Sequence, residues 1–311
     1  MGIIRVKNAF KEFKSCSESK VVLKNFNLNV HKGSMWVANK SIVAMMILWI
    51  IFSYALMGAS GCGKTTLMSC LMGMCSLDKG EVEVFDHHRG AFNNFRIGFM
   101  PQEIALIKEF TIREIVYFFG TIWGMTSDKI GERLQVISQL LDLPNADKLI
   151  RDCSGGQQRR VSFALTLVHE PELLILDEPT VGLDPVLRVK IWDYLVDITR
   201  RKNVTVLLST HYIEEARQST HVGFMRNGSL LTEDTPQNLL EQFEVATLQE
   251  VFLKLSQDQE NGSHDESIGT VVDCSSVDKS KAQRISLPPS EIKIMKALLT
   301  KNLIQVIRNP G

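Results

Sequence analysis

The chain has 311 residues, enough for one large domain with an appendage or for two smaller domains. Its 35 basic and 35 acidic residues balance, so the composition gives no overall positive field of the kind that favours nucleic-acid binding. The six cysteines form no CxxC pair and are too sparse for a disulfide scaffold, and we expect no secretory signal peptide. Reduced thiols in a cytosolic setting are therefore predicted.

The predicted elements begin with short β-segments and continue as alternating helices and strands. Strand-like segments at Ile3–Val6, Val21–Leu23 and Phe26–Val30 are separated by polar turns. Helices are predicted near 66–74, 111–123, 127–143, 155–169, 186–201, 212–218 and 236–255, and strands at 81–85, 96–100, 172–177, 204–209 and 222–231. This alternation is typical of an α/β fold with a largely parallel sheet.

The apolar run Ile42–Met57 has the hydropathy of a membrane segment but does not fit one. Its 16 residues would form a helix of about 24 Å, which is shorter than a hydrocarbon core of roughly 30 Å. A membrane helix would also use up the strand that must lead into the glycine-rich segment beginning at Gly58. We therefore predict that Tyr54–Met57 is a buried strand.

Residues Gly58–Thr65 match the pattern GxxxxGK[ST] of a phosphate-binding loop. Its glycines let backbone N–H groups approach phosphate oxygens, and the following helix offers its positive N-terminus. Lys64 would neutralise the β- and γ-phosphates, and Thr65 would bind Mg²⁺. The alternative for these residues alone is a glycine turn before a helix.

Two carboxylates follow a strongly apolar strand at Leu173–Leu176. Such a strand places Asp177 at its carboxyl end, where open α/β sheets bind ligands. Asp177 then suits the Mg²⁺ shell, and Glu178 is placed to polarise an attacking water. Two solvated carboxylates that end a strand are the alternative, but the glycine loop argues against it.

A second glycine segment, Ser154–Gln157, precedes another predicted helix. Ser and Gly at a helix entrance form a potential anion site, although Ser154 as a simple helix cap explains the segment alone equally well. One nucleotide does not need two such loops about 90 residues apart in the sequence. The second loop therefore suggests a composite site.

Together these motifs resemble the nucleotide-binding domain of an ATP-binding cassette (ABC) transporter over residues 1–255. The resemblance implies an ABC-type P-loop ATPase fold with a mixed sheet core, an antiparallel β-subdomain and a helical subdomain at 105–170. It implies that Phe13 stacks on adenine, Gln102 is the Q-loop glutamine, Gly182–Asp184 is the D-loop and His211 is the switch histidine. Taken singly, Phe13 could be a core residue, and the glutamine and histidine could be ordinary satisfied polar residues.

The resemblance also assigns the site residues. ATP would contact Phe13, Gly58, Ala59, Ser60, Gly61, Cys62, Gly63, Lys64, Thr65 and Thr66, together with Ser154, Gly155, Gly156, Gln157 and Asp184. Mg²⁺ would be held by Thr65, Gln102 and Asp177, and hydrolysis would use Glu178, His211 and Gln102. In that family the signature segment of one domain closes over ATP held by its partner in a head-to-tail dimer.

The sequence around the signature is most similar to the arthropod H subfamily, with the G subfamily as its nearest relative. Members of both are half-transporters in which the ATPase domain precedes six membrane helices. Cys153 stands where the signature usually has Leu. Because that position is apolar and donates nothing to phosphate, we expect no loss of activity from the change.

Compared with the family pattern, residues 36–53 are an insertion. Their removal would join His31–Met35 to Tyr54 as an uninterrupted family sequence. Their amino acids are mainly those that AT-rich codons encode, so we interpret the segment as a translated short intron or gene-model error. A genuine surface hairpin specific to one lineage is the alternative.

The C-terminal part contains two further predicted segments. Residues 256–289 are rich in Ser, Asp, Gln and Lys and are expected to form a flexible linker. Residues 290–311 form a basic amphipathic pattern with apolar positions from Ile292 to Val306, typical of a helix at a membrane interface. The resemblance makes it the connecting helix before a membrane domain that this chain lacks; an ordinary surface helix is the alternative.

The expected function is therefore an ATPase at the cytoplasmic face of a membrane, with the plasma membrane expected for the full-length protein. After dimerisation with a second ABC ATPase domain, it would power export of a hydrophobic or lipid-like substrate, without contact to nucleic acid. Two alternatives stay open. One is a non-functional fragment from a mis-spliced or wrongly assembled transcript, and the other is a soluble ABC ATPase.

Overall fold

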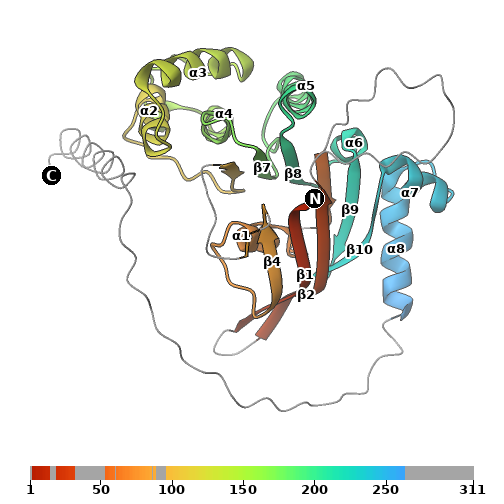
Figure 1. The fold of residues 1–311 in the computed structure, drawn as a ribbon. Helices are drawn as coiled ribbons and strands as arrows, with labels where there is room; N and C mark the ends of the chain where they lie inside the picture. Colours follow the sequence, from red (N-terminus) through yellow and green to blue (C-terminus); the bar gives the residue numbers. More distant parts are fainter. Residues whose placement is uncertain are drawn as a thin grey trace, which may run out of the picture.

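The computed structural model describes residues 2–14, 19–31, 53–59, 61–85, 87–88 and 96–262, which form two sheets and the helices around them (Figure 1). The first sheet has the order β2-β1-β4-β5 and is antiparallel. Its strands are β1 (Gly2–Lys14), β2 (Ser19–His31), β4 (Lys79–Val84) and β5 (His87–His88).

The second sheet has the order β10-β9-β3-β8-β7-β6. Five of its strands run parallel, and β10 pairs antiparallel with β9 at one edge. The strands are β3 (Ser53–Met57), β6 (Ile97–Met100), β7 (Leu173–Asp177), β8 (Thr205–Thr210), β9 (His221–Arg226) and β10 (Ser229–Asp234). This mixed α/β architecture confirms the predicted fold class.

The helices are distributed around the second sheet. Helix α1 packs between the two sheets, and α2–α4 form a helical lobe on the other side (Figure 1). The helices are α1 (Lys64–Leu71), α2 (Ile112–Ile122), α3 (Ser127–Leu140), α4 (Gly155–Leu167), α5 (Pro185–Lys202), α6 (Ile213–Gln218), α7 (Pro236–Gln242) and α8 (Leu248–Gly262). The lobe lies within the segment 105–170 that the sequence assigned to a helical subdomain.

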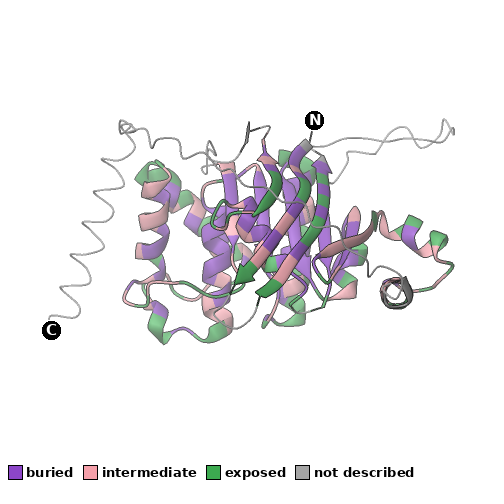
Figure 2. Cartoon of the chain, turned by 90° about the horizontal axis from the view of Figure 1, so that it is seen from below, coloured by how far each residue is buried: buried purple, intermediate pink, exposed green. Residues whose placement is uncertain are grey.

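Alternating side chains of the parallel strands supply two separate cores. In β3, Tyr54 and Leu56 pack into the core shared with α1 and the antiparallel sheet, whereas Ala55 and Met57 face the helical side. All five residues of β3 and of β7 are buried, as expected for strands covered on both faces. Figure 2 shows this buried centre, with exposed residues on the outer faces of the helices. The carboxyl ends of β3 and β7 are thereby fixed by packing on both sides.

Local side-chain chemistry sets several helix starts. Thr111 and Glu114 form a capping box at α2, and Ser154 with Gln157 forms another at α4. Asp184 caps α5 by accepting a hydrogen bond from the Leu187 N–H at 2.9 Å. Ser154 thus does act as a helix cap, as one of the two interpretations of its segment predicted.

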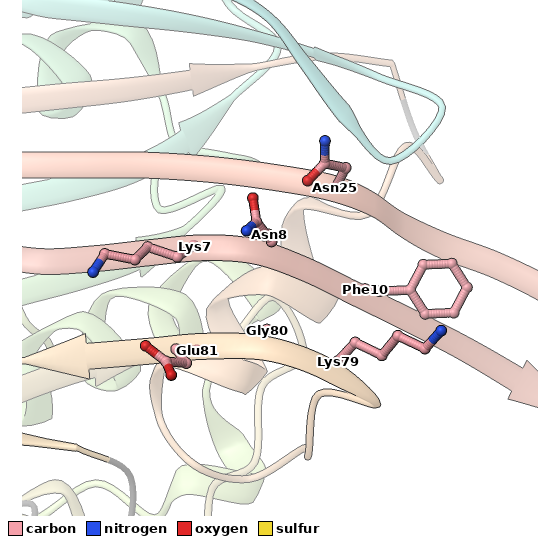
Figure 3. A pocket seen from close by; sticks show the side chains of 7 residues that line it. All are labelled: Lys7, Asn8, Phe10, Asn25, Lys79, Gly80 and Glu81. Atoms are coloured by element: carbon pink, nitrogen blue, oxygen red, sulfur yellow. The ribbon is translucent and has the colours of Figure 1, made fainter. Parts of the chain in front are cut away.

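The antiparallel sheet is irregular at Asn8, where its register with both neighbours shifts. Asn8 has a φ of 49°, and Gly80 on β4 has a φ of 90°. A Cβ at Gly80 would lie 2.4 Å from the Asn8 carbonyl oxygen, so only glycine fits there. The irregularity opens a shallow surface pocket next to Lys79 and the Phe10 ring (Figure 3). This pocket contains none of the predicted site residues.

Several predicted boundaries were wrong. The short β-segments before residue 34 are two continuous strands of 13 residues each. The strand predicted at 222–231 is a hairpin, β9 and β10, that turns at Asn227 and Gly228, both with positive φ. The helix predicted at 236–255 is split into α7 and α8. Because α8 continues to Gly262, the linker predicted from residue 256 begins too early.

Ser53, the last residue of the predicted insertion, belongs to β3. It pairs with Val206 of β8, and its N–H donates to Thr220 Oγ1 at 3.1 Å. The remainder of that segment, 36–52, lies outside the described residues, as do the rest of the predicted linker and the predicted connecting helix at 290–311. Among the described residues, no helix combines the length and hydropathy that a membrane crossing requires.

Candidate ATP-binding site

The glycine loop connects β3 to α1, as predicted, and Ser60 is the one member of Gly58–Thr66 that the structure does not describe. Lys64 is only 5% exposed, and its Nζ donates to the carbonyl oxygens of Gly58 at 2.7 Å and Ala59 at 3.1 Å. Gly63 has a φ of 111°, and a Cβ there would lie 2.7 Å from the Val22 carbonyl oxygen. The loop therefore wraps around the lysine and depends on glycine at this position.

Three predicted polar residues from different elements form a chain of contacts beside this loop. Thr65, at the start of α1, donates through Oγ1 to Gln102 Oε1 at 3.4 Å. Gln102, just after β6, donates through Nε2 to Glu178 Oε2 at 3.2 Å. The structure thus brings the phosphate loop, the predicted Q-loop and the carboxylate after β7 to one place.

Asp177 ends β7 and is 1% exposed. Its Oδ1 accepts a hydrogen bond from Ser209 Oγ on the neighbouring strand β8. Within the part of the chain that the structure describes, its Oδ2 is buried and has no hydrogen-bond partner. A buried carboxylate oxygen of this kind is costly unless it serves a cation. Asp177, Thr65 and Gln102 together offer the oxygen donors that Mg²⁺ uses alongside substrate phosphates.

Glu178 is held in an unusual backbone conformation. Its φ of 50° lies in the left-handed region, which costs a non-glycine residue on the order of 1 kcal/mol. The conformation is fixed because its N–H donates to Ser209 Oγ at 3.0 Å and its carbonyl accepts from Arg159 at 2.6 Å. The carboxylate lies 3.6 Å from His211 Nδ1, measured to Oε1. The predicted catalytic pair is therefore assembled within one chain.

A pocket of about 460 Å³ joins these groups to the antiparallel sheet. Phe13, on β1, is 48% exposed and lines this pocket, as a residue that stacks on a base would. The pocket is lined by Phe13, Lys20, Val22, Gly61, Gly63, Lys64, Thr65, Thr66, Gln102 and Glu178. Lys20 and Val22 were not predicted, because nothing in their local sequence shows that β2 returns beside the loop.

The signature and D-loop residues do not line this pocket. Ser154 and Gly155 are exposed at the start of α4, and a Cβ at Gly155 would meet nothing within 4 Å. A Cβ at Gly156 would lie 3.4 Å from the Gly182 carbonyl oxygen, so the signature and the D-loop are neighbours. Cys153 is buried and its Sγ donates to the Leu149 carbonyl at 3.4 Å, while burial raises the pKa of its thiol.

Arg159 is a positioning residue that the sequence analysis missed. It lies in the first turns of α4 and is 5% exposed. Its guanidinium donates to the carbonyl oxygens of Pro101 and Gln102 on one side, and of Asp177 and Glu178 on the other. Burial lowers its pKa. One buried cation thus ties the helix of the signature segment to the two strand ends that carry Gln102 and the catalytic carboxylates.

Replacement of Arg159 by Met is expected to lower the free energy of unfolding by about 3 kcal/mol, because four carbonyl groups around this buried guanidinium lose their donor. Arg159→Lys keeps the charge but not the planar fork, so it should restore part of the stability. Thermal and urea unfolding measure both effects. Arg200→Met, on the last turn of α5, is a surface control. A loss below about 1 kcal/mol for Arg159→Met would contradict this role.

The fold and the pocket define a P-loop nucleotide-binding domain: a buried strand leads into a lysine-bearing glycine loop, and an Asp-Glu pair ends a parallel strand beside it. A family model described as "ABC transporter" matches residues 53–181. The ABC transporter G family member 23 of Dictyostelium discoideum is 39% identical over 210 residues, which cover 66% of this chain and 30% of that protein.

Two further comparisons concern shorter proteins. The Nod factor export ATP-binding protein I of Rhizobium sp. (strain N33) is 36% identical over 204 residues, covering 64% of this chain and 67% of that protein. The solved post-hydrolysis dimer of an ATP-binding cassette with ADP and Pi bound is 26% identical, with a TM-score of 0.62, and the match covers 75% of this chain and 98% of that one.

This chain belongs to the ATP-binding domain family of ABC transporters, whose members are ATPases coupled to transport. The chain matches about 30% of the length of the G-family relative, so most of that protein has no counterpart in the match. G-family proteins are among the relatives, as the resemblance implied. The finer prediction of an H-subfamily origin stays a prediction.

Proposed function

We propose that this domain binds ATP and Mg²⁺ and hydrolyses ATP after closing head-to-tail on a second ABC ATPase domain. The observation that carries the proposal is the division of its polar residues. Lys64, Thr65, Gln102 and Glu178 share one pocket, whereas the signature residues and Asp184 lie outside it on an exposed neighbouring surface. A second copy supplies what the pocket lacks if the two domains are arranged in opposite directions.

Within one pocket the residues have distinct tasks. The loop N–H groups and Lys64 bind the phosphates, and Phe13 contacts the base. Thr65, Gln102 and Asp177 would hold Mg²⁺, which would neutralise charge on the phosphates. Glu178 accepts a proton from the attacking water, and His211 contacts the γ-phosphate beside it. The backbone contacts of Glu178 already align its carboxylate within one domain, and closure adds the partner's signature.

The transport role extends the proposal to the full-length protein. Relatives include a G-family transporter and a Nod factor export ATP-binding protein, so we infer that ATP hydrolysis here powers export. The substrate class would be hydrophobic or lipid-like. The domain would lie at the cytoplasmic face of a membrane, with the plasma membrane proposed for the full-length protein, and would act on a transmembrane domain outside the described residues.

Gly155→Asp tests the composite site. A Cβ at Gly155 meets nothing within 4 Å, so the fold should be unchanged. A carboxylate there would repel the γ-phosphate of the ATP that the partner domain holds. We expect the variant to bind ATP normally as a monomer and to lose ATP-induced dimerisation and at least about 90% of turnover. Sedimentation velocity in the presence of ATP measures dimerisation, and a phosphate-release assay measures turnover.

The matched control is Asn145→Asp, which adds the same charge to an exposed loop of the same lobe. Asn145 Oδ1 already accepts from the Asp147 N–H, and a carboxylate can do the same. Wild-type dimerisation by Gly155→Asp would argue against a site shared between two domains.

A further inference from the structure

The D-loop and the switch histidine are linked by two side chains that the proposed mechanism does not use. Arg188 lies on α5, directly after the D-loop residues 182–184. Its Nε donates to the Leu183 carbonyl oxygen at 3.1 Å. The central carbon of its guanidinium lies 4.5 Å from the ring centroid of Tyr212. One end of this contact therefore belongs to the D-loop and the other to the residue after His211.

Tyr212 continues the contact to the histidine. Its ring centroid lies 4.3 Å from that of His211, with the two planes inclined at 38°. The backbone of Tyr212 is fixed at both ends, because its N–H donates to Thr210 Oγ1 at 3.0 Å and its carbonyl accepts from the Ala216 N–H at 3.3 Å. The ring is thus anchored between β8 and α6 while its face is open to the guanidinium.

The histidine itself has little else to hold it. Its side chain is 47% exposed, and among the described residues its ionic contact is the 3.6 Å approach of Nδ1 to Glu178 Oε1. A side chain with this much freedom occupies one rotamer only if a neighbour restricts it. The adjacent Tyr212 ring is placed to do so, and the cation over that ring favours a single ring position.

We propose that Arg188 and Tyr212 are positioning residues that hold His211 against Glu178 and make its position depend on the D-loop. This inference rests on the proposed hydrolysis. It adds to that proposal a physical link between the surface that a second domain contacts and the catalytic pair Glu178 and His211. A displacement of Leu183 moves Arg188, which releases Tyr212 and with it the histidine.

Kinetics of single variants form the first test. Arg188→Gln and Tyr212→Leu should each lower kcat by about tenfold, with KM for ATP within about twofold, because neither side chain lines the phosphate pocket. Tyr212→Phe keeps the ring face and should retain most of the wild-type kcat. Arg201→Gln, on the same helix but paired with Asp197 at the surface, is the matched control.

The second test repeats both substitutions in a His211→Ala background. If the two residues act through the histidine, neither should lower kcat further once the histidine is gone. A full additional tenfold loss in that background would overturn the proposal. So would a rise in KM with unchanged kcat.

A third measurement does not need ATP turnover. The ring signals of His211 in an NMR spectrum of the histidine-labelled chain, assigned with His211→Gln, should shift in Arg188→Gln but not in Arg201→Gln. If the wild-type chain hydrolyses no ATP, the proposed hydrolysis is wrong. The NMR signals still test whether Arg188 positions His211. An unchanged His211 signal in Arg188→Gln would overturn it.

Discussion

Glu178→Gln is expected to reduce ATP turnover by about 10²-fold or more while leaving ATP affinity within about threefold of wild type. The substitution keeps the size of the side chain and removes only the ability to accept a proton from water. Glu178 lines the pocket next to Gln102 and His211, and its carbonyl and N–H are held by Arg159 and Ser209. Because the backbone contacts do not involve the carboxylate, the variant should fold and bind normally.

Phosphate release measures turnover, and fluorescence of a labelled ATP analogue measures affinity. Glu214→Gln is a suitable control, since Glu214 is an exposed carboxylate on nearby α6 that does not line the pocket. If Glu178→Gln retained more than about a tenth of the wild-type rate, another group would have to accept the proton. A parallel loss of ATP affinity would instead indicate a disturbed phosphate loop.

Much of the site could be predicted because its chemistry is local in the sequence. The glycine loop, the apolar strand that ends in Asp177 and the capping box at Ser154 each occupy a few consecutive residues. The order of these motifs then placed them at the carboxyl ends of parallel strands, where the structure brings the loop and the carboxylates together.

The missed residues are those whose partners are remote in sequence. Ser209 supports Asp177 and Glu178 from β8, and Lys20 reaches the pocket from β2. Arg159 did carry a usable signal, since it lies near the start of a predicted helix whose residues 161–168 are mostly apolar. A charged side chain at the start of such a helix requires buried acceptors, so a structural role could have been inferred.

Two boundary errors had local signals that the prediction did not use. Asn227 and Gly228 form the turn sequence that hairpins prefer, and this turn divides the predicted strand at 222–231 into β9 and β10. Thr247 and Glu250 have the spacing of a capping box, and they do bond to each other at the start of α8. Hydrophobic periodicity alone cannot detect such breaks, because the apolar pattern runs through them.

Deletion of residues 36–52 is expected to increase the fraction of the chain that binds ATP and to raise its ATPase activity. The structure makes Ser53 the first residue of β3, so the deletion should spare it. β3 lies between β8 and β9 and leads directly into the phosphate loop. The segment just before it, residues 42–52, is as apolar as β3 itself.

We expect residues 36–52 to lower ATP binding and ATPase activity through their apolar composition rather than through their length. A longer connection costs little, since each doubling of loop length adds only about 0.6 kcal/mol. An apolar run that adjoins a central strand can instead pair in its place, and a slip of register would move Lys64 away from the pocket. Competing pairings of this kind reduce the yield of native protein.

A replacement of residues 36–52 by a Gly/Ser linker of equal length separates the two causes. If composition matters, the linker variant should bind ATP and hydrolyse it as well as the deletion does; if length matters, it should stay as poor as the parent chain. ATP bound per mole of soluble protein and phosphate release are measured for all three. Equal activity of the parent chain and the deletion would contradict the prediction and favour a genuine, tolerated hairpin at this position.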